Sequence, residues 1–174
     1  MAPKHLALLF LLGTSWLGFA QTSSDSIAPV VRYEVNQKRY ISVLAGYHYR
    51  KHHFAELGLA VNQYGRKGHH PTAWSLFASS EVKLDNQWLI GPKIGAWIAG
   101  GQSIMAMGIN LIYYTDFEQS SLRLRPEIGI GFGRWKVFYG YNIPLTNRSF
   151  EGINRNTFGF TVLFGVKQTK HIQF

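Results

Sequence analysis

Apolar residues occupy every second position along most of this chain from residue 41 onward. In the last such stretch, Phe158, Phe160 and Val162 alternate with threonine and glycine. A period of two is typical of β-strands with two unlike faces, and the helix-favouring residues alanine, leucine, glutamate and lysine do not recur at the helical spacing of three and four. The alternation predicts eight strands, at residues 41–50, 55–62, 74–84, 88–98, 105–113, 122–131, 135–143 and 157–166.

The two faces of these strands differ in composition. One face is aliphatic and aromatic, and the other holds glycine, small polar residues and most of the charges. An even number of strands joined by turn signals predicts an all-β fold, an eight-stranded antiparallel up-and-down β-barrel. A soluble barrel of the lipocalin kind turns its apolar face inward around an apolar ligand. A transmembrane β-barrel turns the same face outward to lipid.

Three features favour the transmembrane alternative. Small residues on the mixed face suit the crowded interior of an eight-stranded barrel. Segments of about ten residues match the length that a tilted strand needs to cross a bilayer. Aromatic residues near the segment ends suit an interfacial girdle, and these are Trp74, Trp88, Tyr113, Trp135 and Tyr141. We therefore expect a membrane barrel, with a soluble periplasmic ligand-binding barrel as an alternative.

The first twenty residues read as a cleavable signal peptide. Lys4 and His5 precede an apolar stretch at 6–12, and Ala20 stands before Gln21. The leader predicts export. We expect residues 21–38 to form an N-terminal lead-in or an extension of the first strand, and residues 39–174 to form the barrel. The chain contains no cysteine, which excludes a disulfide scaffold and an anchor through an N-terminal cysteine.

On these patterns the chain resembles the small eight-stranded outer-membrane proteins of Gram-negative bacteria, the OmpA and OmpX type of barrel. The resemblance rests on the alternating pattern and covers nearly the whole mature chain. The stretches 125–127 and 141–144 also resemble small barrels of this type, but they point to no activity. It implies a location in the outer membrane, contact with lipid and lipopolysaccharide, and a monomer. It also implies that the terminal Phe174 is an assembly signal for the barrel-assembly machinery, with an ordinary tail as the alternative.

The net charge is +9, and removal of Lys4 with the leader leaves +8. A positive charge of this size suggests that the surface attracts anionic groups such as lipopolysaccharide phosphates. The alternative is a basic surface without a special role. Signatures of nucleic-acid binding are missing, so we expect no nucleic-acid partner.

Eight charged residues fall on the predicted interior face. Enclosed charges are costly unless they are paired, so we expect opposite charges to meet across strands as a salt-bridged plug. A polar path for ions is the alternative, but Phe77, Trp97 and Phe138 also point inward and favour a closed interior. The interior charge network comprises Glu56, Glu81, Lys83, Lys93, Arg123, Arg125, Glu127 and Lys136.

Paired histidines at 52–53 and 69–70 raise the question of a metal site. The pairs flank one strand and so lie at opposite ends of the barrel, and adjacent strand residues point to opposite faces. We therefore predict neither a metal site nor a cofactor.

A lipid-modifying hydrolase or acyltransferase is the remaining chemical alternative. Its site would use a serine nucleophile and a histidine base oriented by an acid, and His48, Ser149 and Glu151 are the candidates. No spacing signature supports this grouping. The sequence therefore favours a non-enzymatic barrel whose role in adhesion, surface interaction or envelope integrity resides in loops at 116–121 and 146–156.

Overall fold

The computed structural model describes residues 35–85, 88–101, 104–150 and 152–173. The expected leader at 1–20 and the expected assembly signal Phe174 lie outside the described residues. Within the described ranges, no helix has the length and apolar character required to span a membrane.

The described residues form an all-β structure with antiparallel pairing throughout. The strands are β1 (Val35–Tyr49), β2 (His53–Lys67), β3 (His70–Lys83), β4 (Ile90–Gly100), β5 (Met105–Thr115), β6 (Ser120–Phe132), β7 (Trp135–Tyr141), β8 (Ile143–Pro144) and β9 (Asn156–Gln173). Both β7 and β8 pair with β6 and are separated by Asn142, so they form one interrupted strand. All eight expected strands are present.

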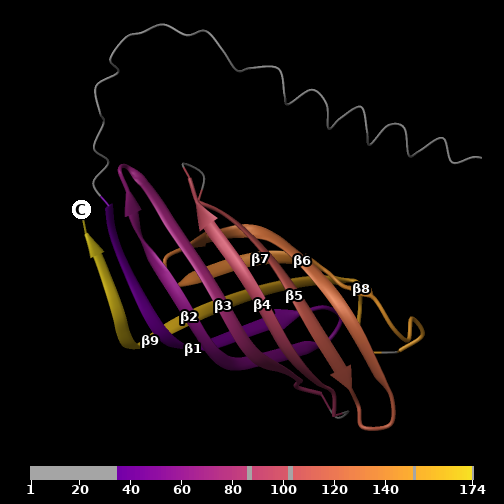
Figure 1. Ribbon diagram of the computed structural model, residues 1–174. Helices are drawn as coiled ribbons and strands as arrows, with labels where there is room; N and C mark the ends of the chain where they lie inside the picture. Colours follow the sequence, from indigo (N-terminus) through magenta and orange to yellow (C-terminus); the bar gives the residue numbers. More distant parts are fainter. Residues whose placement is uncertain (1–34, 86–87, 102–103, 151, 174) are drawn as a thin grey trace, which may run out of the picture. The chain divides into compact units, whose positions relative to one another are not determined.

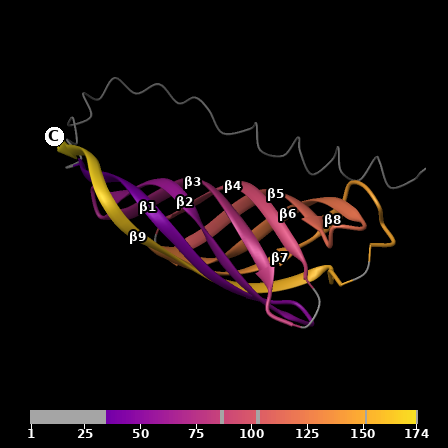
Figure 2. The ribbon, with the colours of Figure 1, turned by 90° about the horizontal axis from the view of Figure 1, so that it is seen from below.

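The strands form a closed ring of hydrogen-bonded neighbours. Each strand pairs with the next in the chain from β1 to β7, and β9 pairs with both β7 and β1. The ring therefore runs up and down through eight strand positions (Figures 1 and 2). The start of β1 and the end of β9 lie at the same end, which we call the terminus end; the opposite end, where β1 meets β2 and β8 meets β9, is the loop end.

The second and third strands extend beyond the expected ranges of 55–62 and 74–84, so the connection between them is short. Strand β2 continues to Lys67 and β3 begins at His70, so the turn consists of Gly68 and His69. The polar residues at the end of β2 remain in the ladder because β1 extends equally far and pairs Val35 with Lys67. Gly68 has a φ of 61°, which glycine adopts without the steric cost of a side chain.

The apolar positions of the alternation point out of the ring, and the mixed positions point into it. Leu57 and Ile98 are 66% and 62% exposed, whereas Glu81 and Arg125 are completely buried. This is the reverse of the arrangement that a soluble ligand-carrying fold requires. The exposed outward side chains include Leu57, Leu59, Leu76, Ile94, Ile98, Met107, Ile109, Ile128, Val137, Phe160 and Phe164, which we call the apolar belt.

Two apolar layers fill the ring interior above and below a charged layer. The layer toward the terminus end contains Leu44, Ala60, Ala73, Phe77, Trp97, Ala99, Ala106 and Leu163. The layer toward the loop end contains Phe54, Leu89, Ile112, Tyr114, Phe150 and Ile153. Along β3, the inward-facing Phe77 of the first layer lies nearer the terminus end than Glu81. Glu81 accepts a hydrogen bond from Tyr114 of the second layer, so Glu81 lies between the two layers.

Candidate functional site

Glu81 of β3 is the centre of the buried charged layer. Its carboxylate accepts hydrogen bonds from Arg50 and Arg125, from Lys93 Nζ at 2.9 Å and from the Tyr114 hydroxyl at 2.6 Å. These partners come from β4, β5, β6 and the position that directly follows β1. A fully buried carboxylate requires such charged donors, because burial removes its hydration.

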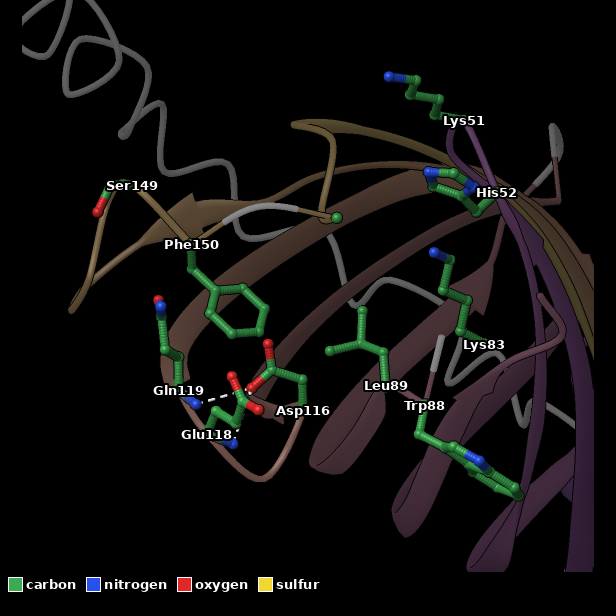
Figure 3. Close-up of a pocket in the computed structure, with 11 residues that line it drawn as sticks. Lys51, His52, Lys83, Trp88, Leu89, Asp116, Glu118, Gln119, Ser149 and Phe150 are labelled. Atoms are coloured by element: carbon green, nitrogen blue, oxygen red, sulfur yellow. Dashed lines mark hydrogen bonds between the residues drawn. The ribbon is translucent and has the colours of Figure 1, made fainter. Parts of the chain in front are cut away.

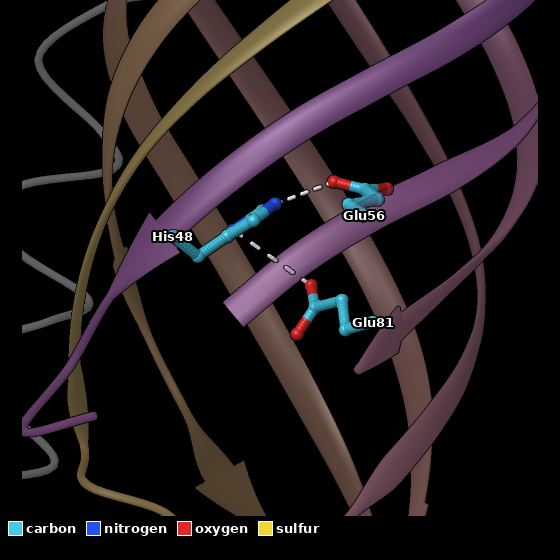
Figure 4. A group of neighbouring side chains, drawn as sticks. All are labelled: His48, Glu56 and Glu81. Carbon is cyan, nitrogen blue, oxygen red and sulfur yellow. Dashed lines mark hydrogen bonds and ion pairs between the residues drawn. The ribbon is translucent and has the colours of Figure 1, made fainter. Parts of the chain in front are cut away.

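Glu56 of β2 extends the charged layer toward β1. Its carboxylate lies 2.5 Å from His48 Nε2 and 2.6 Å from Lys93 Nζ, and it accepts a hydrogen bond from Ser79 Oγ at 2.5 Å. Figure 4 shows the His48 ring between the two carboxylates, with Nδ1 3.8 Å from Glu81 Oε1. Lys93 therefore bridges Glu56 and Glu81.

Glu127 of β6 completes the layer. Its carboxylate accepts hydrogen bonds from Lys136 and from Arg125 Nε at 3.1 Å. Arg125 thus bridges Glu81 and Glu127, and the three carboxylates form one continuous network with four lysine and arginine side chains. We call this set the interior network: Arg50, Glu56, Glu81, Lys93, Arg125, Glu127 and Lys136.

All eight charges expected on the interior face are buried, but two of them are not in the interior network. Lys83 Nζ lies 3.7 Å from the Asp85 carboxylate near the loop end. Arg123 donates to the backbone carbonyls of Phe150 and Ile153, each at 3.2 Å, and so holds the connection between β8 and β9.

Arg50, His48 and Tyr114 contact the carboxylates of the charged layer but were not assigned to this role from the sequence. Arg50 follows β1 with the inward parity of His48, so its direction was readable although its partner was not. The Arg50 guanidinium also lies over the rings of Phe54 and Tyr114, at 4.2 and 5.0 Å from their centroids. Nothing in the sequence distinguished Tyr114 from an ordinary core residue, which is the usual role of a buried tyrosine.

The histidine pairs remain apart, as the sequence indicated. His52 lies 2.5 Å from Asp85 at the loop end, and His69 lies in the turn at the terminus end. The potential metal ligands that converge among the described residues are instead His48, Glu56 and Glu81. Lys93 already bonds both carboxylates there, so a metal ion would have to displace an ammonium group.

The hydrolase grouping does not assemble in the described part of the chain. His48 is fully buried and contacts Glu56, whereas Ser149 Oγ donates to Asn147 Oδ1 at 3.0 Å in the last loop. Glu151 lies outside the described residues. Ser79 does contact Glu56, but a nucleophile needs the histidine base beside it, and here the carboxylate stands between serine and histidine.

The loop end encloses a bowl of about 810 Å³ to which all four connections at that end contribute. Figure 3 shows Asp116, Glu118 and Gln119 on one side and Lys51, His52 and Lys83 on the other. Leu89 and Phe150 form the apolar base and belong to the layer that covers the interior network. The bowl is therefore a polar recess closed at its base.

Aromatic residues of the expected girdle lie at both ends of the ring. Trp74 and Trp135 lie toward the terminus end, since Trp74 pairs with Gln63 and Trp135 begins β7. Toward the loop end lie Trp88, which lines the bowl, Tyr113 and Tyr141. Trp88, Tyr113 and Tyr141 are exposed, and the two other tryptophans are half-buried.

No protein-family model, no curated protein and no solved structure matches this chain.

Proposed function

We propose that this protein is a non-enzymatic transmembrane β-barrel of the outer membrane, with a plugged interior and with loops that contact external molecules. The apolar belt is the observation that carries the proposal. Contiguous exposed apolar patches of this extent are uncommon on monomeric soluble proteins and indicate contact with a membrane or a partner.

The interior supports the same proposal. Small membrane barrels have charged and small side chains inside and aliphatic side chains outside, and the ring has the same distribution. The aromatic residues at both ends suit the two interfaces of a bilayer. The buried interior network between two apolar layers supports a barrel closed to solutes, since every member is less than a tenth exposed.

The bowl supports a role at the loop end. With the interior filled, external molecules can reach polar side chains only at the rims, and the bowl is the larger recess described there. We assign adhesion, surface interaction or envelope integrity to it, with lipopolysaccharide as a neighbouring partner. The barrel-assembly machinery, reading Phe174, is the partner proposed for insertion.

Cell fractionation with electrophoresis of heated and unheated samples tests the proposal. We expect the protein in the outer-membrane fraction, with a mobility that changes on heating because a folded barrel resists detergent. Recovery in the soluble periplasm without a mobility change would overturn the proposal and favour a soluble binding protein.

The absence of cysteine from the sequence allows a clean topology test. Ser149→Cys places a thiol in an exposed loop at the loop end, and Thr169→Cys places one in the exposed part of β9 at the terminus end. A membrane-impermeant maleimide should label Ser149→Cys in intact cells and Thr169→Cys only after lysis. Equal labelling of both thiols in intact cells would contradict a spanning orientation.

Planar-bilayer recording tests closure. A plugged barrel should insert without steady conductance, and stable open-channel steps from the purified protein would contradict the plug.

A further inference from the structure

Charge is distributed unevenly between the two ends of the ring. The described carboxylates lie in the interior network or at the loop end, where Asp85, Asp116 and Glu118 are found. The described side chains at the terminus end include lysine and arginine but no aspartate or glutamate: Lys38, Arg39, Arg66, Lys67, Arg134, Lys167 and Lys170. Such a concentration of one sign attracts anions.

A cleft of about 470 Å³ at this end gathers three of these cations. Lys38 lies on β1, Arg66 on β2 and Arg134 in the turn between β6 and β7. Lys38 and Arg66 lie on one face of the β1–β2 ladder, because Lys38 pairs with Tyr64 and Asn36 pairs with Arg66. Neither Lys38 nor Arg66 forms an ion pair with any other described residue.

Two stacked tyrosines form a platform for the third cation, Arg134. The rings of Tyr40 and Tyr64 are 5.4 Å apart and nearly parallel, at 7°. The Arg134 guanidinium lies over both, at 5.3 and 5.1 Å from their centroids, and Nε donates to the Tyr64 hydroxyl at 2.8 Å. This hydrogen bond raises the pKa of Arg134.

Gly133 determines how Arg134 reaches the platform. Its φ of 58° is favourable for glycine and makes the turn that brings Arg134 back over β2. An added Cβ at Gly133 would lie 3.8 Å from the Tyr64 ring, so the turn packs directly on the platform. The guanidinium is therefore held in place before any ligand arrives, which lowers the entropic cost of binding.

We propose that this cleft binds an oxyanion, the phosphate or carboxylate group of a soluble ligand. Guanidinium groups pair with both kinds of oxyanion through planar, charge-assisted hydrogen bonds. Lys38 and Arg66 supply further donors on the same face, and the described lining residues supply no competing carboxylate. The inference goes beyond the proposed function, and of its tests only the nanodisc comparison requires insertion into a bilayer.

Titration calorimetry on the full mature chain in a neutral detergent tests the proposal, with inorganic pyrophosphate and citrate as probes. We expect at least one probe to bind, more weakly as salt is added. Arg134→Gln and Arg66→Gln should each weaken binding by about tenfold, since each removes a charge-assisted hydrogen bond. The probe that binds more tightly distinguishes phosphate from carboxylate.

Lys170→Gln is the matched control, because Lys170 carries the same charge at the same end but does not line the cleft. It should bind the probe within about twofold of the unaltered chain. Equal losses of probe affinity in Lys170→Gln and Arg66→Gln would show that binding depends only on the overall positive charge, and would overturn the proposal. Failure of both probes to bind at millimolar concentration would overturn it as well.

Nanodiscs distinguish a soluble ligand from a lipid headgroup. Equal probe affinity in phosphatidylcholine and phosphatidylglycerol discs supports a soluble ligand. Loss of probe binding in phosphatidylglycerol alone would assign the cleft to lipid and overturn the proposal as stated.

Discussion

Glu81 and Arg125 lie 44 positions apart in the sequence and form an ion pair in which both side chains are fully buried. They belong to β3 and β6, which are not neighbours in the ring. The pair therefore connects strands across the interior, where the hydrogen bonds of the sheet do not reach. Arg125 also pairs with Glu127, and Lys93, which pairs with Glu81, also pairs with Glu56. Several strands are therefore connected through Glu81.

Glu81→Gln should destabilise the protein strongly. The amide keeps the size of the side chain but leaves Arg50, Arg125 and Lys93 without their shared carboxylate, and breaking such a buried pair costs about 3–5 kcal/mol. Urea unfolding followed by tryptophan fluorescence would measure the loss. Asp85→Asn is the control, because the Asp85 carboxylate is 41% exposed and should contribute about 1 kcal/mol or less. Equal stability of Glu81→Gln and the unaltered chain would contradict a structural role for the network.

Leu59→Arg tests the environment of the apolar belt. Leu59 is 63% exposed in the middle of β2, so in water the change should alter the free energy of unfolding by about 0.5 kcal/mol or less. In contact with lipid, the same change should cost about 2–4 kcal/mol. Unfolding from lipid vesicles measures the difference. Thr169→Arg on the exposed part of β9 should be close to neutral in either environment, and a neutral Leu59→Arg would argue against lipid contact.

Gly159→Ala should overpack the interior. A Cβ on Gly159 would collide with the Phe138 ring, which already packs edge-on against His48 at a centroid distance of 5.4 Å. Overpacking of this kind costs about 1–3 kcal/mol. Phe138→Leu removes the colliding ring, so the double variant should lose less stability than the sum of the two single variants. Simple additivity in urea unfolding would show that the two residues do not compete for space.

Arg123→Gln should loosen the last loop without weakening the sheet. It removes the guanidinium that holds the carbonyls of Phe150 and Ile153, so the loop should open about tenfold more often. Hydrogen exchange followed by mass spectrometry would show faster exchange in peptides from the loop and unchanged exchange in β1 and β2. Arg148→Gln removes an exposed arginine from the same loop and should leave the exchange rates unchanged.

Much of the fold was readable from local pattern. The parity of Phe158, Phe160 and Phe164 predicted a strand with one apolar face, and β9 has that strand with those side chains exposed. Strand length was harder to predict. The polar end of β2 reads as a loop, but it pairs because β1 continues alongside it.

The alternation along the sequence determined the strands and their two faces, because successive side chains of a strand point to opposite sides. It placed Glu81 and Arg125 on the mixed face, and the small residues of that face favoured its turning inward. The tertiary structure decided which inward groups meet. Ring closure and strand register placed Arg50 and Arg125 on Glu81, diverted Arg123 to backbone carbonyls and brought Arg134 onto Tyr40 and Tyr64. Contacts across an interior depend on the three-dimensional offset of distant strands, and a period of two contains no information about that offset.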